Sequence, residues 1–101
     1  MKSQPEGTTY RYNFKRHVPI DDIQDSLTLA ALSTEQLHGR ARMRLDARFR
    51  LDRQRRTCTI DAGTAVGRDL AKLFAGYLSA EFGDEAFRVR RTVDNRVEAR
   101  S

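Results

Sequence analysis

The chain has 101 residues, a formal net charge of +5 and a sequence pI of about 10.0, which allow one basic domain with one modest core. No apolar run approaches the ~20 residues that a membrane-spanning helix needs, and residues 1–9 lack the apolar stretch of a secretory signal, so we expect neither. Cys58 is the only cysteine, which excludes an internal disulfide and favours a cytoplasmic protein.

The first part of the chain predicts a flexible tail, a strand and a long helix. Residues 1–9 are polar and are expected to be the tail, whereas residues 10–17 alternate aromatic and polar side chains, as in a strand. Residues 19–38 begin with proline, carry apolar side chains at helical spacing and end before Gly39, which suits a helix cap. A capping-box pattern at residues 33–36 leaves open whether this helix breaks and restarts.

Residues 40–52 alternate strictly between apolar and charged side chains. Successive side chains of a strand point to opposite faces, so the pattern predicts one long strand with an apolar side and an arginine side. A strand of this length exceeds the usual five or six residues, and we expect a bend, or fraying at Arg40. The charged phase consists of Arg40, Arg42, Arg44, Asp46, Arg48, Arg50 and Asp52.

The second half of the chain predicts a hairpin, a second helix and a last strand. A polar turn at residues 52–56 precedes a short strand at residues 57–61. Thr64 is a suitable N-cap for a helix with a wide apolar stripe that ends at Gly83. Residues 86–93 read as the last strand and residues 94–101 as a charged, frayed tail, so that residues 10–93 form a single domain.

The element order is strand, helix, strand, strand, helix, strand. Two right-handed crossovers sharing one sheet give an α+β fold of the two-layer, ferredoxin-like split βαβ type, which is a four-stranded antiparallel sheet with both helices on one face. The first and third strands would be central, and the arginine strand of residues 40–52 would be an edge. This resemblance is to a widely used fold and implies little about activity.

The face of the sheet without helices is predicted to be strongly basic. Nine basic and three acidic residues give it a net charge of +6, compared with +5 for the whole chain. Arginine suits phosphate and carboxylate, so the face would bind nucleic acid or another anion. Alternatively, the arginines pair with the acids or protect a sheet edge from aggregation. The basic residues are Arg11, Lys15, Arg40, Arg42, Arg44, Arg48, Arg50, Arg88 and Arg90, and the acids are Asp46, Asp52 and Asp61.

All eight aromatic side chains fall in the inward phases of their elements. The basic face therefore has no platform on which bases could stack, which disfavours sequence-specific binding of single strands. Backbone contacts to a duplex and contacts to an acidic protein surface both stay open.

Two further groups of residues carry weaker signals of a site. Gly63, Thr64 and Arg68 lie in a turn that opens a helix and could bind a small anion, but without phosphate-loop spacing a simple tight turn is favoured. His17, His38 and Cys58 share no metal-ligand spacing. We expect no metal, no cofactor and no catalytic residues, and hence no enzyme.

Two functions follow from these patterns. The first is a small non-catalytic nucleic-acid-binding or accessory module that uses the arginine face on phosphates. The alternative is a protein-interaction or assembly subunit that self-associates, as a homodimer, and binds an acidic protein surface. No membrane partner is expected.

Overall fold

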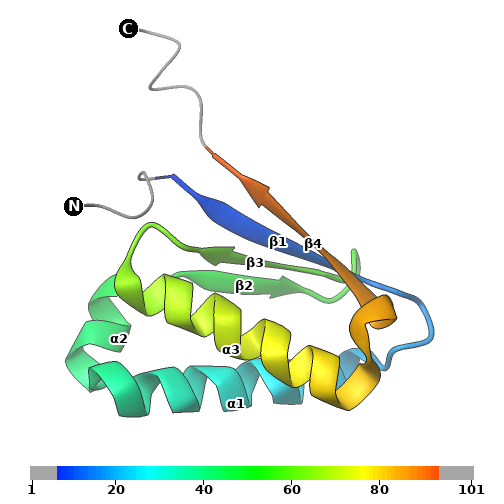
Figure 1. The fold of residues 1–101 in the computed structure, drawn as a ribbon, viewed down its shortest axis with the longest axis horizontal. Helices are drawn as coiled ribbons and strands as arrows, with labels where there is room; N and C mark the ends of the chain where they lie inside the picture. Colours follow the sequence, from blue (N-terminus) through cyan, green and yellow to red (C-terminus); the bar gives the residue numbers. More distant parts are fainter. Residues whose placement is uncertain (1–6, 94–101) are drawn as a thin grey trace, which may run out of the picture.

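A four-stranded antiparallel sheet and three α-helices form the mixed α+β fold of residues 7–93, the part of the chain that the computed structural model describes (Figure 1). In chain order the elements are β1 (Thr9–Phe14), α1 (Ile20–His38), α2 (Arg40–Asp46), β2 (Phe49–Asp52), β3 (Thr57–Asp61), α3 (Ala65–Phe82), the 3-10 turn η1 (Asp84–Ala86) and β4 (Phe87–Thr92). None of these helices is long and apolar enough to cross a membrane.

The sheet has the strand order β2-β3-β1-β4, so the first and third strands are central, as expected. Helices α1 and α3 cover one face of this sheet (Figure 1). Thr8 is buried and β1 begins at Thr9, so both residues belong to the fold and not to the expected tail. Residues 1–6 of that tail and the expected tail at residues 94–101 lie outside the described residues.

The prediction of one long strand over residues 40–52 is wrong for its first half. Residues Arg40–Asp46 form helix α2, and only Phe49–Asp52 form strand β2. The partner strand β3 ends at Asp61, whose N–H donates to the Arg48 carbonyl at 2.9 Å. Earlier residues have no strand with which to pair, and a helix satisfies their backbone groups internally. Arginine, alanine, methionine and leucine are also good helix formers.

The two long helices end as their local sequences predict. Helix α1 continues through residues 33–36 without a break and stops at Gly39, which has φ +91°. Helix α3 begins after Thr64, whose hydroxyl accepts a hydrogen bond from the Gly67 N–H at 3.0 Å. It stops at Gly83, which has φ +90°.

The core lies between the sheet and the helices α1 and α3. Tyr12 is 1% exposed, packs edge-on against Phe74 at 4.9 Å between ring centroids, and donates its hydroxyl to the Ala71 carbonyl at 2.8 Å. Burial, with smaller contributions from the charges of Cys58 and Tyr10, raises the pKa of Tyr12 above its ordinary value. Tyr12 therefore joins the central strand to α3 through both its ring and its hydroxyl.

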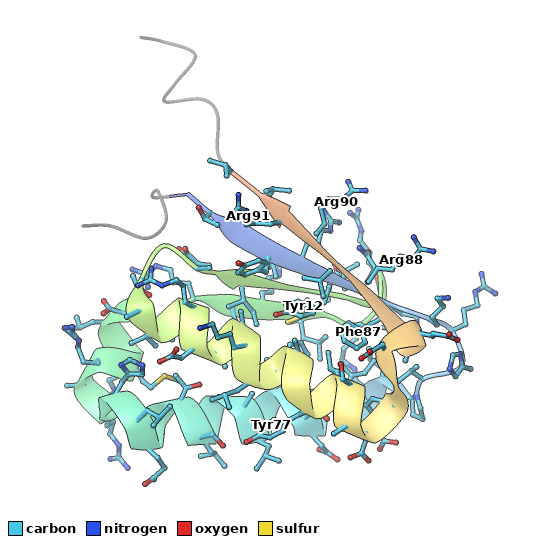
Figure 2. The ribbon with its side chains drawn as sticks, viewed as in Figure 1. Tyr12, Tyr77, Phe87, Arg88, Arg90 and Arg91 are labelled. Atoms are coloured by element: carbon cyan, nitrogen blue, oxygen red, sulfur yellow. The ribbon has the colours of Figure 1, made fainter. Side chains whose placement is uncertain are left out.

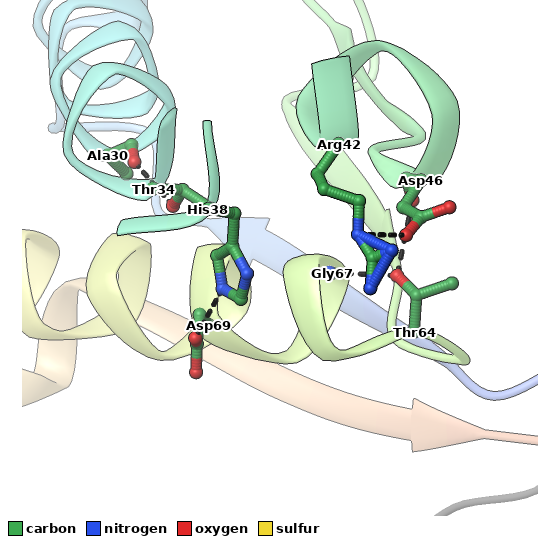
Figure 3. A network of polar contacts seen from close by, with 8 residues as sticks. All are labelled: Ala30, Thr34, His38, Arg42, Asp46, Thr64, Gly67 and Asp69. Carbon is green, nitrogen blue, oxygen red and sulfur yellow. Dashed lines mark hydrogen bonds and ion pairs between the residues drawn. The ribbon is translucent and has the colours of Figure 1, made fainter. Parts of the chain in front are cut away.

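Polar contacts fasten α2 to the neighbouring helices (Figure 3). The Thr64 hydroxyl donates to the Asp46 carbonyl at 3.2 Å, so the residue that caps α3 also holds the end of α2. At the end of α1, the His38 ring lies 2.7 Å from an Asp69 carboxylate oxygen on α3. The Thr64 contact thus joins the end of α2 to the start of α3, and the His38–Asp69 contact joins α1 to α3.

Candidate anion-binding surface

Three arginines from three strands lie in one row across the face of the sheet that α1 and α3 leave open. In the antiparallel registers, Arg11 is opposite Arg90 on one side and opposite Thr59 on the other, and Thr59 is opposite Arg50. The neighbouring Tyr12 is buried on the helix side, so pleating directs Arg11 to the open face. We call Arg11, Arg50 and Arg90 the arginine row.

Arg88 extends the row along β4. It lies opposite Asn13, two residues along each strand from the Arg11–Arg90 pair. Figure 2 shows Arg88 and Arg90 projecting away from the helices, whereas Phe87 points back toward them. Four exposed arginines therefore share one face of the sheet.

The arginine row is not neutralised by the acids beside it. Among the residues 7–93, no ion pair or hydrogen bond is formed by the side chains of the row. Asp52 instead accepts from the Arg55 backbone N–H at 3.0 Å, and Asp61 accepts from the Gly63 N–H at 2.9 Å. The face thus keeps cationic groups without local partners, at the energetic cost of placing Arg11 directly opposite Arg90.

One end of the row opens into a shallow polar hollow of about 510 Å³. Its lining includes two threonines of β3, and its cations come from β1, β2 and the β2–β3 turn. Phosphate oxygens accept hydrogen bonds from both hydroxyl and guanidinium groups, so this lining suits a phosphate. The lining residues are Arg11, Arg50, Asp52, Gln54, Arg55, Thr57 and Thr59.

The other five basic residues predicted for this face lie outside the strands. Arg48 and Lys15 are exposed at the two ends of the strands, just before β2 and just after β1. Arg40, Arg42 and Arg44 belong to α2, which corrects their placement on the sheet. Arg40 pairs with Glu35 at 3.2 Å and Arg42 with Asp46 at 3.6 Å.

This correction lowers the charge of the open face. Removing the α2 residues Arg40, Arg42, Arg44 and Asp46 from the count leaves six basic residues against Asp52 and Asp61, for a net charge of +4 in place of the predicted +6. Four of the six are strand arginines, and the other two, Lys15 and Arg48, flank the strands. The charge excess of the chain is therefore divided between the sheet and α2. What distinguishes the sheet is the alignment of its arginines and their lack of partners among residues 7–93.

Gly63, Thr64 and Arg68 lie where the sequence placed them, at the start of α3. The Gly63 N–H is bound by the Asp61 carboxylate, and the Thr64 hydroxyl is engaged with both Gly67 and Asp46. An external anion would compete with a carboxylate that the chain already supplies. The Gly63 N–H and the Thr64 hydroxyl, which we expected to bind a ligand, instead form hydrogen bonds within the junction between β3 and α3.

Two arginines that the sequence patterns did not mark have defined places. Arg55 lines the polar hollow. Arg56 has φ +56° in the β2–β3 turn, and its guanidinium donates to the Lys15 carbonyl at 2.7 Å and to the Val18 carbonyl. The run of residues 52–56 indicates a turn, but nothing in it indicates which arginine turns inward.

A second hollow, of about 440 Å³, lies on the helix side of the edge strand β2, and we call it the α1–β2 groove. Leu32 is 55% exposed on its helical wall and Phe49 is 40% exposed on its strand wall. Its apolar residues are Leu27, Ala31, Leu32, Met43, Phe49 and Leu51, and its polar residues are Gln24, Thr28, Glu35, Arg50 and Arg53.

Cys58 is fully buried on β3, and burial raises the pKa of its thiol to about 12. His38 is hydrogen-bonded to Asp69, and His17 is exposed in the middle of the β1–α1 loop. Within residues 7–93, no group of three or more histidine, cysteine, aspartate or glutamate side chains could hold a metal ion.

Comparisons with known proteins find no family model, no curated protein and no solved structure that matches this chain.

Proposed function

We propose that this protein is a small non-catalytic module that binds the phosphates of nucleic acid with the arginine row. The observation that supports this most is the register pairing of Arg11 with Arg90, because two guanidinium groups placed side by side without an acid repel each other until an anion binds. Arg50 continues the row at the polar hollow.

The row favours contacts to backbone over recognition of bases. No aromatic side chain of the described strands belongs to the open phase, and the exposed Phe49 lines the α1–β2 groove on the other side of the sheet. Phosphate contacts position a protein on a duplex without reading its sequence. We therefore propose a duplex as the target, bound with little sequence preference.

Fluorescence anisotropy with labelled duplex DNA and RNA, at several salt concentrations, tests this proposal. The variant Arg11→Gln/Arg90→Gln should bind more weakly, and its log–log salt slope on DNA should fall by about 0.9 for each phosphate that the protein no longer neutralises. The matched control Arg40→Gln/Arg44→Gln removes the same charge from α2 and should bind nearly as well as the wild type. Equal losses of affinity in both variants would show general charge attraction and refute a site on the sheet.

The second candidate is an assembly subunit that self-associates and uses its arginines on an acidic protein surface. The specific support is the α1–β2 groove, whose exposed Leu32 and Phe49 lie beside an edge strand with free backbone groups. Sedimentation velocity over a range of concentrations tests it, and a strict monomer at high concentration would contradict it.

We also propose that the fold is a ferredoxin-like split βαβ arrangement in which α2 is an addition between the first helix and the second strand. The central position of β1 and β3 supports this assignment. A cytoplasmic location is proposed with it, on the ground that the single cysteine is buried and serves as a core residue.

A further inference from the structure

The two edge strands of the sheet, β2 and β4, differ in the charges that would face each other if the strand paired with the same strand of a second chain. On β4, Arg88 and Arg90 share the open face and no acid of the strand accompanies them, so self-pairing about Val89 or Arg90 would oppose arginines and no register within the strand would give an ion pair. On β2, Arg50 and Asp52 share the open face, two residues apart. Of the two described edge strands, only β2 carries both an arginine and an aspartate on the open face, and so can form ion pairs with a second copy of itself.

The backbone of β2 presents a defined set of free groups. Because the Asp61 N–H donates to the Arg48 carbonyl, residues 48, 50 and 52 direct their backbone groups toward β3. Phe49 and Leu51 consequently direct theirs toward the free edge. A two-fold axis at Leu51 would place the N–H and carbonyl of Leu51 against the same groups of the partner copy.

We propose that two copies of this chain pair antiparallel through β2, about a two-fold axis at Leu51, and join their four-stranded sheets into one continuous sheet. In this register Arg50 of each copy lies opposite the partner's Asp52, which gives two cross-strand ion pairs. A register centred on Arg50 would instead oppose two arginines. A register shifted by one residue would place Arg50 opposite Leu51 and mix the two faces of the sheet.

The helix side of β2 fits the same arrangement. Phe49 would lie opposite the partner's Arg53, whose aliphatic stem can cover an aromatic ring while its guanidinium stays bound to Asp21 and Gln24 of its own chain. The α1–β2 groove, with Leu32 exposed by 55%, would come close to its own symmetry copy and be shielded from water. This inference rests on the proposed assembly role and specifies its partner, its strand and its register.

Charge reversal on β2 tests the ion pairs. In sedimentation velocity, Arg50→Asp and Asp52→Arg should each weaken dimerisation by about tenfold or more, because each puts two like-charged pairs at the interface. The double variant Arg50→Asp/Asp52→Arg should restore the dimer, since the pairs are then reversed in sign. The control Arg90→Asp makes the same change on β4 and should dimerise like the wild type. Circular dichroism establishes that each variant is folded.

Cysteine cross-linking tests the register independently of stability. Residue 50 and the partner's residue 52 would form a non-hydrogen-bonded pair with Cα atoms about 4.5 Å apart, within the range of a disulfide. A mixture of Arg50→Cys and Asp52→Cys proteins should form the heterodimeric disulfide under mild oxidation, and Arg50→Cys alone should not.

The outcomes separate the two levels of the proposal. A wild-type monomer at every concentration would overturn both the assembly role and the β2 interface. A dimer that is insensitive to charge reversal and forms no mixed disulfide would overturn only the β2 interface. Self-cross-linking of Arg50→Cys would overturn the axis at Leu51 in favour of one at Arg50.

Discussion

Gly67 in α3 packs so closely on the end of β3 that a Cβ atom at this position would lie 1.8 Å from the Asp61 carbonyl oxygen. This approach fixes the start of α3 against the sheet, next to the Thr64 cap that also holds α2. The approach involves backbone atoms, so a side chain at position 67 cannot be accommodated by a change of rotamer.

We therefore predict that Gly67→Ala destabilises the protein by about 3 kcal/mol or more, despite the better helix propensity of alanine. The control Gly76→Ala lies in the same helix, where a Cβ would meet nothing within 4 Å. It should stabilise the protein by about 0.5–1 kcal/mol. Urea denaturation of both variants measures the contrast, and similar effects at the two positions would contradict the close approach.

The Arg11–Arg90 pair should cost stability in the absence of a ligand. We predict that Arg90→Thr raises the free energy of unfolding by a few tenths to about 1 kcal/mol at low salt, because it relieves a like-charge pair. Arg91→Thr is the control, since Arg91 lies opposite Tyr10. The difference in free energy of unfolding between Arg90→Thr and Arg91→Thr should become smaller as added salt screens the charges. No difference at low salt would show that the two guanidinium groups avoid each other.

Arg56 is predicted to be structural. Arg56→Ala leaves the Lys15 and Val18 carbonyls without their guanidinium donor and should cost about 1–3 kcal/mol. Arg56→Gly removes the same hydrogen bonds but also relieves the strain of φ +56°, so it should be less destabilised than the alanine variant by about 1 kcal/mol. Thermal and urea unfolding measure both, and an alanine variant as stable as the wild type would show that the bonds contribute nothing.

The buried thiol of Cys58 should make stability fall at alkaline pH. Its pKa is raised from an ordinary 9.0 to about 12, so the folded state favours the protonated form. The resulting stabilisation is complete below pH 9 and is lost as the pH rises toward 12. We predict that the wild type loses more stability than Cys58→Ala between about pH 8.5 and about pH 10.5, by the amount expected for one titrating group. Parallel curves for the two proteins would contradict this.

Much of the fold could be predicted from the sequence because its signals are local. The limits of α1 and α3 follow from Gly39, Thr64 and Gly83, each of which acts within one turn of its helix. Strand β3 was predicted with its observed limits, Thr57–Asp61, from alternation over a short stretch bounded by turns. The central position of β1 and β3 followed from the order of the elements.

Only the tertiary structure decided what residues 40–52 become. Their alternation is compatible with a strand, but a strand needs a neighbouring strand with which to pair. The neighbour β3 ends at Asp61, which lies opposite Arg48, so residues before Arg48 have no pairing partner on β3. Residues 40–46, composed of good helix formers, therefore satisfy their backbone groups in α2. The sequence by itself determined that this stretch is rich in arginine and that the aromatic side chains of the strands avoid the open face of the sheet. The strand registers decided which arginines meet, because pairing across β1, β3 and β4 depends on contacts between residues far apart in the chain.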